Sequence, residues 1–240
     1  ARAYPLSILM WHEIANDIVG GHPFAVTYCP LCNAAIVFDA EIDGKRHTFG
    51  TTGRLRNSDL LMYDRVTESW WQQFSGEAVI GDYTGRILDM IPSRLESFAS
   101  FSSRHPDGKV LVPSDPDFRE YGRNPYVGYD SRNAPYPFFT GEMPEGINPM
   151  ARVIVLRDDG EAVAVISLEK ARAESPLEFS GFRIEWQAGR ASALDTATIQ
   201  DGRDIGNLKI TKLDDNTDAV HDLTFAFVAH AFHPELTIAK

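Results

Sequence analysis

The stretch that decides the local fold is Phe24-Ala25-Val26-Thr27-Tyr28-Cys29-Pro30-Leu31-Cys32-Asn33-Ala34-Ala35-Ile36-Val37-Phe38. Two apolar runs flank a Cys-x-x-Cys pair, and Pro30 between the sulfurs presets a backbone angle suited to a turn. We therefore expect two extended strands joined by a tight turn, called here the cysteine turn (residues 29–33). Asp43-Gly44, a common hairpin dipeptide, predicts a second reversal before residues 46–49.

Cys29 and Cys32 are the only cysteines among the 240 residues. Two neighbouring cysteine sulfurs can bind a soft metal ion, act as a dithiol/disulfide redox couple or form a structural disulfide. In thioredoxin-like sites a helix follows the pair and lowers the thiol pKa, whereas a strand is expected here. A bridge across so short a loop stabilises less than the roughly 3 kcal/mol expected for a 15-residue loop. A metal or another functional use is favoured, although a full zinc site needs four ligands and the chain supplies two sulfurs.

Met62 is the first candidate for a further ligand. A thioether beside two thiolates makes a soft donor set that suits Cu(I) better than Zn²⁺. Strand alternation puts Met62 on the same side as Leu60 and Asp64. The alternative is that Met62 only fills the hydrophobic core.

His47 is the second candidate, because it lies on the strand after the predicted hairpin and can turn toward the cysteine turn. The alternative is an exposed strand residue, since two basic residues precede it. His105 and His233 each precede a proline at the end of a predicted helix, where an imidazolium interacts favourably with the helix dipole. These two are interpreted as helix caps rather than ligands.

Composition excludes several classes of function. With 34 acidic and 23 basic residues the formal charge is −11, which disfavours nucleic acid and anionic membranes as partners. No apolar stretch approaches the roughly 20 residues of a membrane span. The chain begins with Ala1 rather than Met, which leaves room for an upstream signal segment. Hydrolase motifs such as G-x-S-x-G and H-E-x-x-H do not occur. The sequence does not identify a small-molecule or protein partner.

The remaining pattern predicts short strands and a few helices. A helix is expected over residues 6–15, and strands are expected at 60–63 and 70–74 and at 78–80 and 86–88. Ser93-Arg94-Leu95-Glu96 has the form of a capping box and predicts a helix that continues through Phe101 to His105-Pro106. The fold class expected is α+β and β-rich, built from antiparallel strands and hairpins with a few short helices.

Residues 113–149 form an unusual connecting segment. They hold seven of the 14 prolines and seven aromatic residues, whereas disordered linkers are poor in aromatics. We expect an ordered loop there, joining a cysteine-containing β-rich unit at 1–112 to a second unit at 150–240 that packs on the first as one compact domain.

The second unit repeats features of the first. Residues 162–168 resemble residues 1–9, and residues 225–234 resemble residues 98–106, including the His-Pro at the helix end. The pattern indicates an internally duplicated unit whose second copy lacks the cysteines. The alternative is that any two amphipathic helices ending at proline look alike.

Several short runs together resemble the DUF3179 family, a domain of unknown function. The runs are Ala3-Tyr4-Pro5-Leu6, Asn16-Asp17, Val26-Thr27-Tyr28-Cys29-Pro30-Leu31-Cys32, Thr48-Phe49-Gly50, Gly53-Arg54-Leu55, Asn57-Ser58-Asp59-Leu60, Met62-Tyr63-Asp64-Arg65, Thr67-Glu68-Ser69-Trp70 and His105-Pro106. The resemblance covers the chain and is densest over residues 1–112. It implies an extracytoplasmic setting, periplasmic or secreted, and brings no established chemistry.

Three functional hypotheses follow. The first is a soft transition metal, copper before zinc, held by Cys29 and Cys32 with Met62 or His47 completing the site. The second is a thiol/disulfide oxidoreductase in which Cys29 attacks and Cys32 resolves. The third is a binding module with a structural disulfide clip, whose partner contacts the tyrosine-rich residues 121–139.

Overall fold

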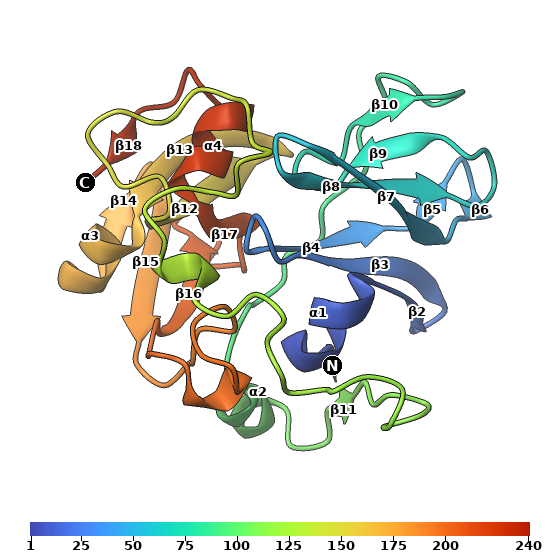
Figure 1. The fold of residues 1–240 in the computed structure, drawn as a ribbon, viewed down its shortest axis with the longest axis horizontal. Helices are drawn as coiled ribbons and strands as arrows, with labels where there is room; N and C mark the ends of the chain where they lie inside the picture. The colour runs from blue at the N-terminus through green and yellow to red at the C-terminus, as the bar shows by residue number, and fades with distance from the viewer.

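The computed structural model describes residues 1–240, and its strands form several separate sheets (Figure 1). Strands hold 38% of the residues and helices 14%, which confirms the β-rich α+β class. The elements up to residue 112 are β1 (Arg2–Ala3), α1 (Leu6–His12), β2 (Ile14–Val19), β3 (His22–Cys29), β4 (Ala34–Asp39), β5 (Glu41–Ile42), β6 (Lys45–Arg46), β7 (Phe49–Arg56), β8 (Asp59–Asp64), β9 (Trp70–Gln72), β10 (Ala78–Ile80), α2 (Phe98–Arg104) and β11 (Lys109–Val110). The later elements are η1 (Tyr129–Ser131), β12 (Arg152–Asp158), β13 (Glu161–Ser167), α3 (Leu168–Ala173), β14 (Leu177–Phe179), β15 (Phe182–Gln187), η2 (Ile199–Asp201), β16 (Asn207–Lys212), β17 (His221–Phe225), α4 (Ala226–Phe232) and β18 (Ile238–Ala239).

The first sheet is the antiparallel meander β2-β3-β4, and the quoted apolar runs form its β3 and β4. Helix α1 is shorter than the sequence pattern indicates and ends at His12. Its last turn stops because Glu13 adopts a left-handed φ of 59° while its N–H closes onto Leu9 O. Residues 14 and 15, expected in the helix, instead begin β2.

The second sheet has the order β10-β9-β8-β7 and contains the expected hairpin between β8 and β9. The strand predicted at residues 86–88 is absent, and only a single bridge, Glu77 with Ile87, lies there. The predicted helix start was also wrong. The α2 helix is capped by Ser97, whose side chain accepts from Ser100 N, and residues 93–97 are not helical.

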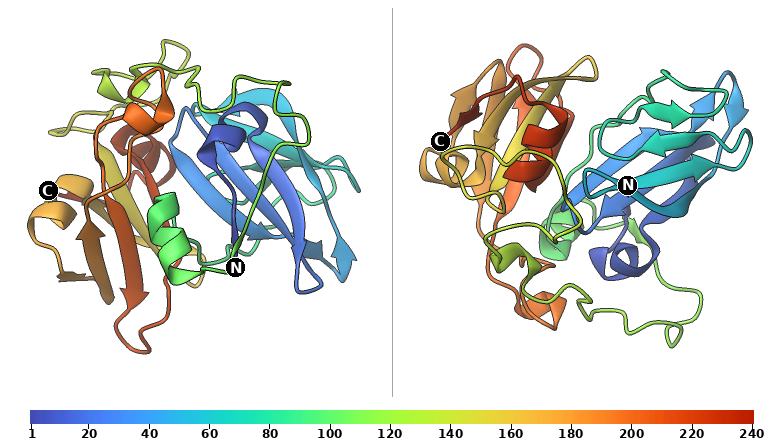
Figure 2. Two further views of the ribbon diagram at one scale, coloured as in Figure 1. Left: turned by 90° about the horizontal axis from the view of Figure 1, so that it is seen from below. Right: turned by 45° about the horizontal axis from the view of Figure 1, so that its top comes forward.

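The second half of the chain contributes the sheets β17-β12-β13-β18 and β14-β15-β16. Figure 2 shows these sheets beside those of the first half, with residues 113–149 running across both groups. That segment contains no strand and one short 3₁₀ helix, η1, yet Tyr129 and Phe139 are buried in the core. The division of the chain at residues 112 and 150 stays a prediction.

The two halves share an order of elements. In the first half, β1 leads into α1 and the meander β2-β3-β4, and after α2 the strand β11 pairs parallel with β1. In the second half, β13 leads into α3 and the meander β14-β15-β16, and after α4 the strand β18 pairs parallel with β13. His105 and His233 end α2 and α4 with similar backbone angles. Internal duplication stays a prediction. A duplicated chain would have a shared order of elements of this kind.

One large hydrophobic cluster contains residues from both halves, among them Cys29, Cys32, Val153 and Phe225. Buried ion pairs join distant segments beside it. Arg157 Nε lies 2.7 Å from Asp222 Oδ2, and the same guanidinium donates to Phe74 O in the first half at 3.1 Å. No helix is long and apolar enough to cross a membrane.

Candidate metal centre

The cysteine turn has the geometry that the sequence predicts. Cys29 ends β3 and pairs with Ala34, the first residue of β4. Cys32 N donates to Cys29 O at 3.2 Å, and Asn33, with a left-handed φ of 54°, completes the reversal. The two thiols are not bonded to each other, and both are buried.

A carboxylate from another sheet meets the two thiols. Asp59 begins β8 directly after the two-residue turn Asn57-Ser58, in which both residues have a positive φ. One ligand atom each from Cys29, Cys32 and Asp59 lie within 4.8 Å of one another. The three residues are only 2%, 0% and 0% exposed. The structure therefore brings together a buried set of two sulfurs and one oxygen.

Asp59 has one oxygen engaged and one oxygen free. Its Oδ2 accepts hydrogen bonds from Gln72 Nε2 and from Phe74 N, the latter at 2.8 Å. Its Oδ1 is buried and has no partner. An unpaired buried acceptor is unusual in native proteins and indicates a ligand, an ion or an ordered water. The free oxygen belongs to the residue that lies beside the two thiols.

The backbone carbonyl of Ser58 lies beside the two sulfurs. Its carbonyl accepts from Cys32 Sγ at 3.4 Å and from Cys29 Sγ at 3.8 Å. Its hydroxyl Oγ is buried without a partner. Ser58 also holds a φ of 62°, and backbone strain of this kind in a non-glycine residue is often found at functional sites. The Ser58 carbonyl is therefore a further oxygen beside the two sulfurs.

Burial controls the protonation of the three groups. It raises the pKa of Asp59 to about 6, because the ionised carboxylate is removed from water. Burial is also the main cause that raises the pKa of the Cys29 thiol, and together with the nearby Cys29 it raises the pKa of Cys32 well above its ordinary value. At neutral pH both sulfurs are thus thiols, and thiols are poor nucleophiles.

Comparison with protein-family models matches residues 1–236 to a family described as a protein of unknown function, DUF3179. The chain belongs to the DUF3179 family. Neither the curated proteins nor the solved structures contain a match to it. Two of the runs that carry the DUF3179 resemblance, residues 26–32 and 57–60, supply all three members of the buried set.

Met62 lies in the core of the DUF3179 fold, fully buried on β8. Met62 is three residues after Asp59, and side chains alternate between the two faces along a strand, so the two side chains lie on opposite faces of β8. The neighbouring strand agrees, since Gln72 bonds to Asp59 whereas Trp71, paired with Met62, donates from Nε1 to Asp64. The structure thus brings Asp59 to the sulfurs, and a role for Met62 as ligand stays a prediction.

His47 is only 1% exposed, so the expectation of an exposed strand residue was wrong. It is buried because its ring contacts Tyr83, at 5.8 Å between centroids, while its Nδ1 lies 3.0 Å from Lys45 O. Its Nε2 has no partner. His47 is not part of the set formed by the two cysteines and Asp59, and its role as a ligand also stays a prediction.

The cysteine turn is fixed from outside by the second half of the chain. Thr224 Oγ1 donates to Cys32 O at 2.7 Å, and Asn33 Nδ2 donates to Leu223 O at 3.2 Å. Tyr129, from the connecting segment, donates its hydroxyl to Leu31 O at 3.1 Å. These contacts hold the turn rigid, which is what a metal site with a defined geometry requires.

Proposed function

We propose that this protein binds one transition-metal ion through Cys29, Cys32 and Asp59. The observation that carries the proposal is the meeting of three buried ligand atoms within 4.8 Å, one of them on a carboxylate with an unpartnered oxygen. Metal binding would displace the thiol protons and give the free Asp59 oxygen a partner.

Zinc fits this donor set better than copper. The sequence-based preference for copper depended on a thioether from Met62 as the third donor. A carboxylate oxygen is a harder donor than a thioether, and Zn²⁺ accepts sulfur and oxygen ligands together. Ser58 offers the oxygen that would complete a four-coordinate site. We therefore propose zinc, with Cu(I) as the metal to compare against it.

The proposed centre is structural. All three ligands are buried, so a substrate has no direct approach to the ion. The ion would join the β3–β4 turn to the start of β8, which belong to different sheets. Thiol/disulfide exchange is less well supported, because it needs an accessible thiolate and burial raises the pKa of both thiols. The extracytoplasmic setting implied by the resemblance forms part of the same proposal.

The direct test is metal analysis of the purified, untagged protein together with titration of its free thiols. Zinc is expected at one equivalent, with two thiols titrating after its removal. Cys29→Ser, Cys32→Ser and Asp59→Asn should each lose stoichiometric zinc. Asp64→Asn is the matched control, because Asp64 is also a buried aspartate of β8 but lies away from the sulfurs.

Two results would count against the proposal. One is retention of a full equivalent of zinc by both cysteine variants, which would place the ion elsewhere. The other is rapid alkylation of the metal-free protein by iodoacetamide at pH 6, which would require a thiolate of low pKa and would promote the oxidoreductase alternative.

A further inference from the structure

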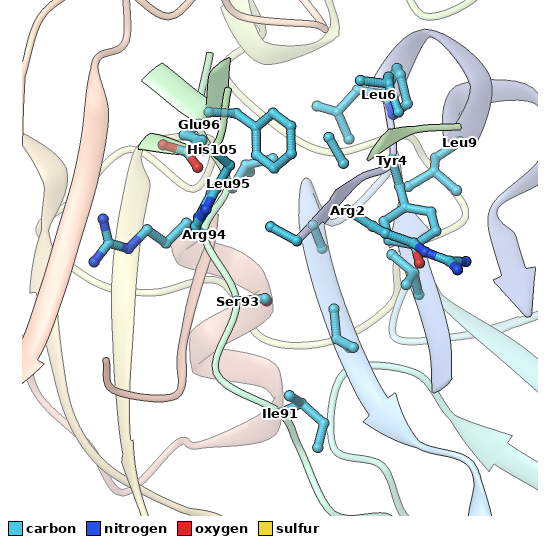
Figure 3. A pocket seen from close by; sticks show the side chains of 18 of the residues that line it. Arg2, Tyr4, Leu6, Leu9, Ile91, Ser93, Arg94, Leu95, Glu96 and His105 are labelled. Carbon is cyan, nitrogen blue, oxygen red and sulfur yellow. The ribbon is translucent and has the colours of Figure 1, made fainter. Parts of the chain in front are cut away.

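A cavity of about 550 Å³ lies between the first sheet and the segment that leads into α2 (Figure 3). Its volume is in the range of small-molecule sites, roughly 300–1,000 Å³. Of its 26 lining residues 16 are hydrophobic, so its wall resembles that of a site for an apolar ligand. Figure 3 shows Leu6, Leu9 and the Tyr4 ring on one side and Leu95 on the other.

The cavity and the candidate metal centre use opposite faces of the same sheet. Phe24 and Val26 on β3 line the cavity, as does Val37, which pairs with Val26 across the sheet. Cys29 is three residues after Val26 on β3, and side chains alternate between the two faces along a strand, so Cys29 lies on the face opposite to Val26. A ligand in the cavity would therefore not touch the thiols, and this inference does not depend on the proposed metal.

The three arginines around the cavity already form ion pairs. Arg94 forms a two-point ion pair with Asp218 at 2.6 and 2.9 Å. Two further arginines at the cavity are also paired, Arg2 with Asp17 and Arg104 with Glu96. In Figure 3 the guanidinium groups of Arg2 and Arg94 point away from the middle of the cavity. An anionic ligand would thus find no unpaired arginine there.

We propose that this cavity binds an uncharged apolar molecule, of the class of a medium-length hydrocarbon chain such as a fatty alcohol. The apolar wall would be removed from water by such a ligand, which is the main source of affinity in sites of this kind. The paired arginines give no preference for a carboxylate over a hydroxyl at the end of the chain.

The test uses N-phenyl-1-naphthylamine, an uncharged fluorescent probe, with the full chain. One probe molecule should bind per protein, and 1-dodecanol should displace it at least as well as dodecanoate at pH 8. Displacement by dodecanoate at tenfold lower concentration than 1-dodecanol would show recognition of a carboxylate and overturn the proposal, as would a lack of saturable probe binding.

Variants locate the probe. Val37→Lys puts a charge into the cavity from a partly exposed strand position and should raise the Kd of the probe at least about tenfold, since burying an unpaired charge is unfavourable. Val163→Lys is the matched control, because Val163 is also a strand valine, is 43% exposed and lies outside the cavity, and its Kd should not change. Leu6→Trp, which fills the cavity without a charge, should weaken binding even if Val37→Lys fails to fold.

An unchanged Kd in both Val37→Lys and Leu6→Trp would overturn the proposal. So would sedimentation showing a concentration-dependent dimer that Val37→Lys abolishes without any probe binding to the native chain, because the occupant would then be a second copy. Zinc content should be the same in Val37→Lys and the native chain, which separates failure here from failure of the metal proposal.

Discussion

At the scale of single residues, the proposed metal centre depends most on Asp59. It is fully buried, its Oδ2 accepts hydrogen bonds from Gln72 and Phe74, and its Oδ1 has no hydrogen-bond partner. A carboxylate in this position is unfavourable when ionised and alone, and favourable when it binds a cation. Its titration therefore reports on the state of the site.

The metal-free protein should lose stability as pH rises through the titration of Asp59. Its pKa is about 6 when folded and 3.8 ordinarily, so the neutral form stabilises the fold fully below pH 3.8 and this contribution is lost as pH rises past 6. The difference corresponds to about 3 kcal/mol. Urea unfolding with a chelator should show the stability of the native chain falling relative to that of Asp59→Asn by about 2.4 kcal/mol between pH 4 and 7, which is most of this difference. A constant difference between the two proteins would contradict it.

Zinc affinity should rise steeply with pH. Both thiols are protonated at neutral pH because burial raises their pKa, so binding releases two protons. The apparent affinity should then increase about 100-fold per pH unit between pH 6 and 8, measured by competition with a chromophoric chelator of known pH dependence. A pH-independent affinity would mean that the sulfurs are not the ligands.

Met62→Leu should leave metal binding unchanged. The substitution conserves volume and hydrophobicity in the core, so the free energy of unfolding should fall by less than about 1.5 kcal/mol. Binding of zinc and of Cu(I) is measured in parallel. A loss of Cu(I) affinity without a matching loss of stability would restore Met62 as a ligand and copper as the preferred metal.

At the scale of elements, α2 shows how tertiary contacts override a local motif. Ser93-Arg94-Leu95-Glu96 has the spacing of a capping box, but residues 93–97 are held outside the helix because Leu95 O accepts from Arg190 and Ser97 N donates to Asn207 Oδ1. Ser97 then caps the helix instead.

Ser97→Ala should therefore cost about 1 kcal/mol of stability, the usual value of an N-cap. Ser93→Ala is the matched control and should change stability by less than about 0.5 kcal/mol, since Ser93 caps nothing. Denaturant unfolding of the two variants checks this. An equal or larger loss in Ser93→Ala would place the helix start where the sequence motif predicts it.

The contrast between local sequence signals and tertiary contacts explains what could be predicted from the sequence. The cysteine turn was predictable because Pro30, the flanking apolar runs and the short spacing are local signals. Asp59 was not identified as a partner, since it reaches the sulfurs through pairing of β7 with β8 and packing of two sheets. Its signal was present as a carboxylate directly after the turn-forming Asn57-Ser58, at the start of an apolar strand.

At the scale of the whole molecule, hydrogen bonds at the cysteine turn and elsewhere join the two halves of the chain. Thr224 and Asn33 connect it to β17, and Arg157 connects β12 to Phe74. An ion bound in the turn should therefore stabilise the chain as a unit. At a free zinc concentration 1,000 times the Kd this stabilisation is about 4 kcal/mol.

Thermal unfolding should accordingly show one transition that zinc shifts as a whole. Trp71 lies in the first half and Trp186 in the second. Two variants, one with Trp71 and one with Trp186 as its single tryptophan, therefore report on each half by fluorescence. Both should give the same Tm with and without zinc. Two transitions, with zinc acting only on the one seen by Trp71, would show that the halves unfold independently.

X-ray absorption at the zinc edge, recorded on the zinc-loaded native chain, identifies the atoms bound to the ion. We expect two sulfur neighbours at about 2.3 Å and at least one oxygen neighbour at about 2.0–2.2 Å. A first shell without sulfur, or with four sulfur neighbours and none at the shorter distance of oxygen, would contradict the assignment of Cys29, Cys32 and Asp59 as the metal centre.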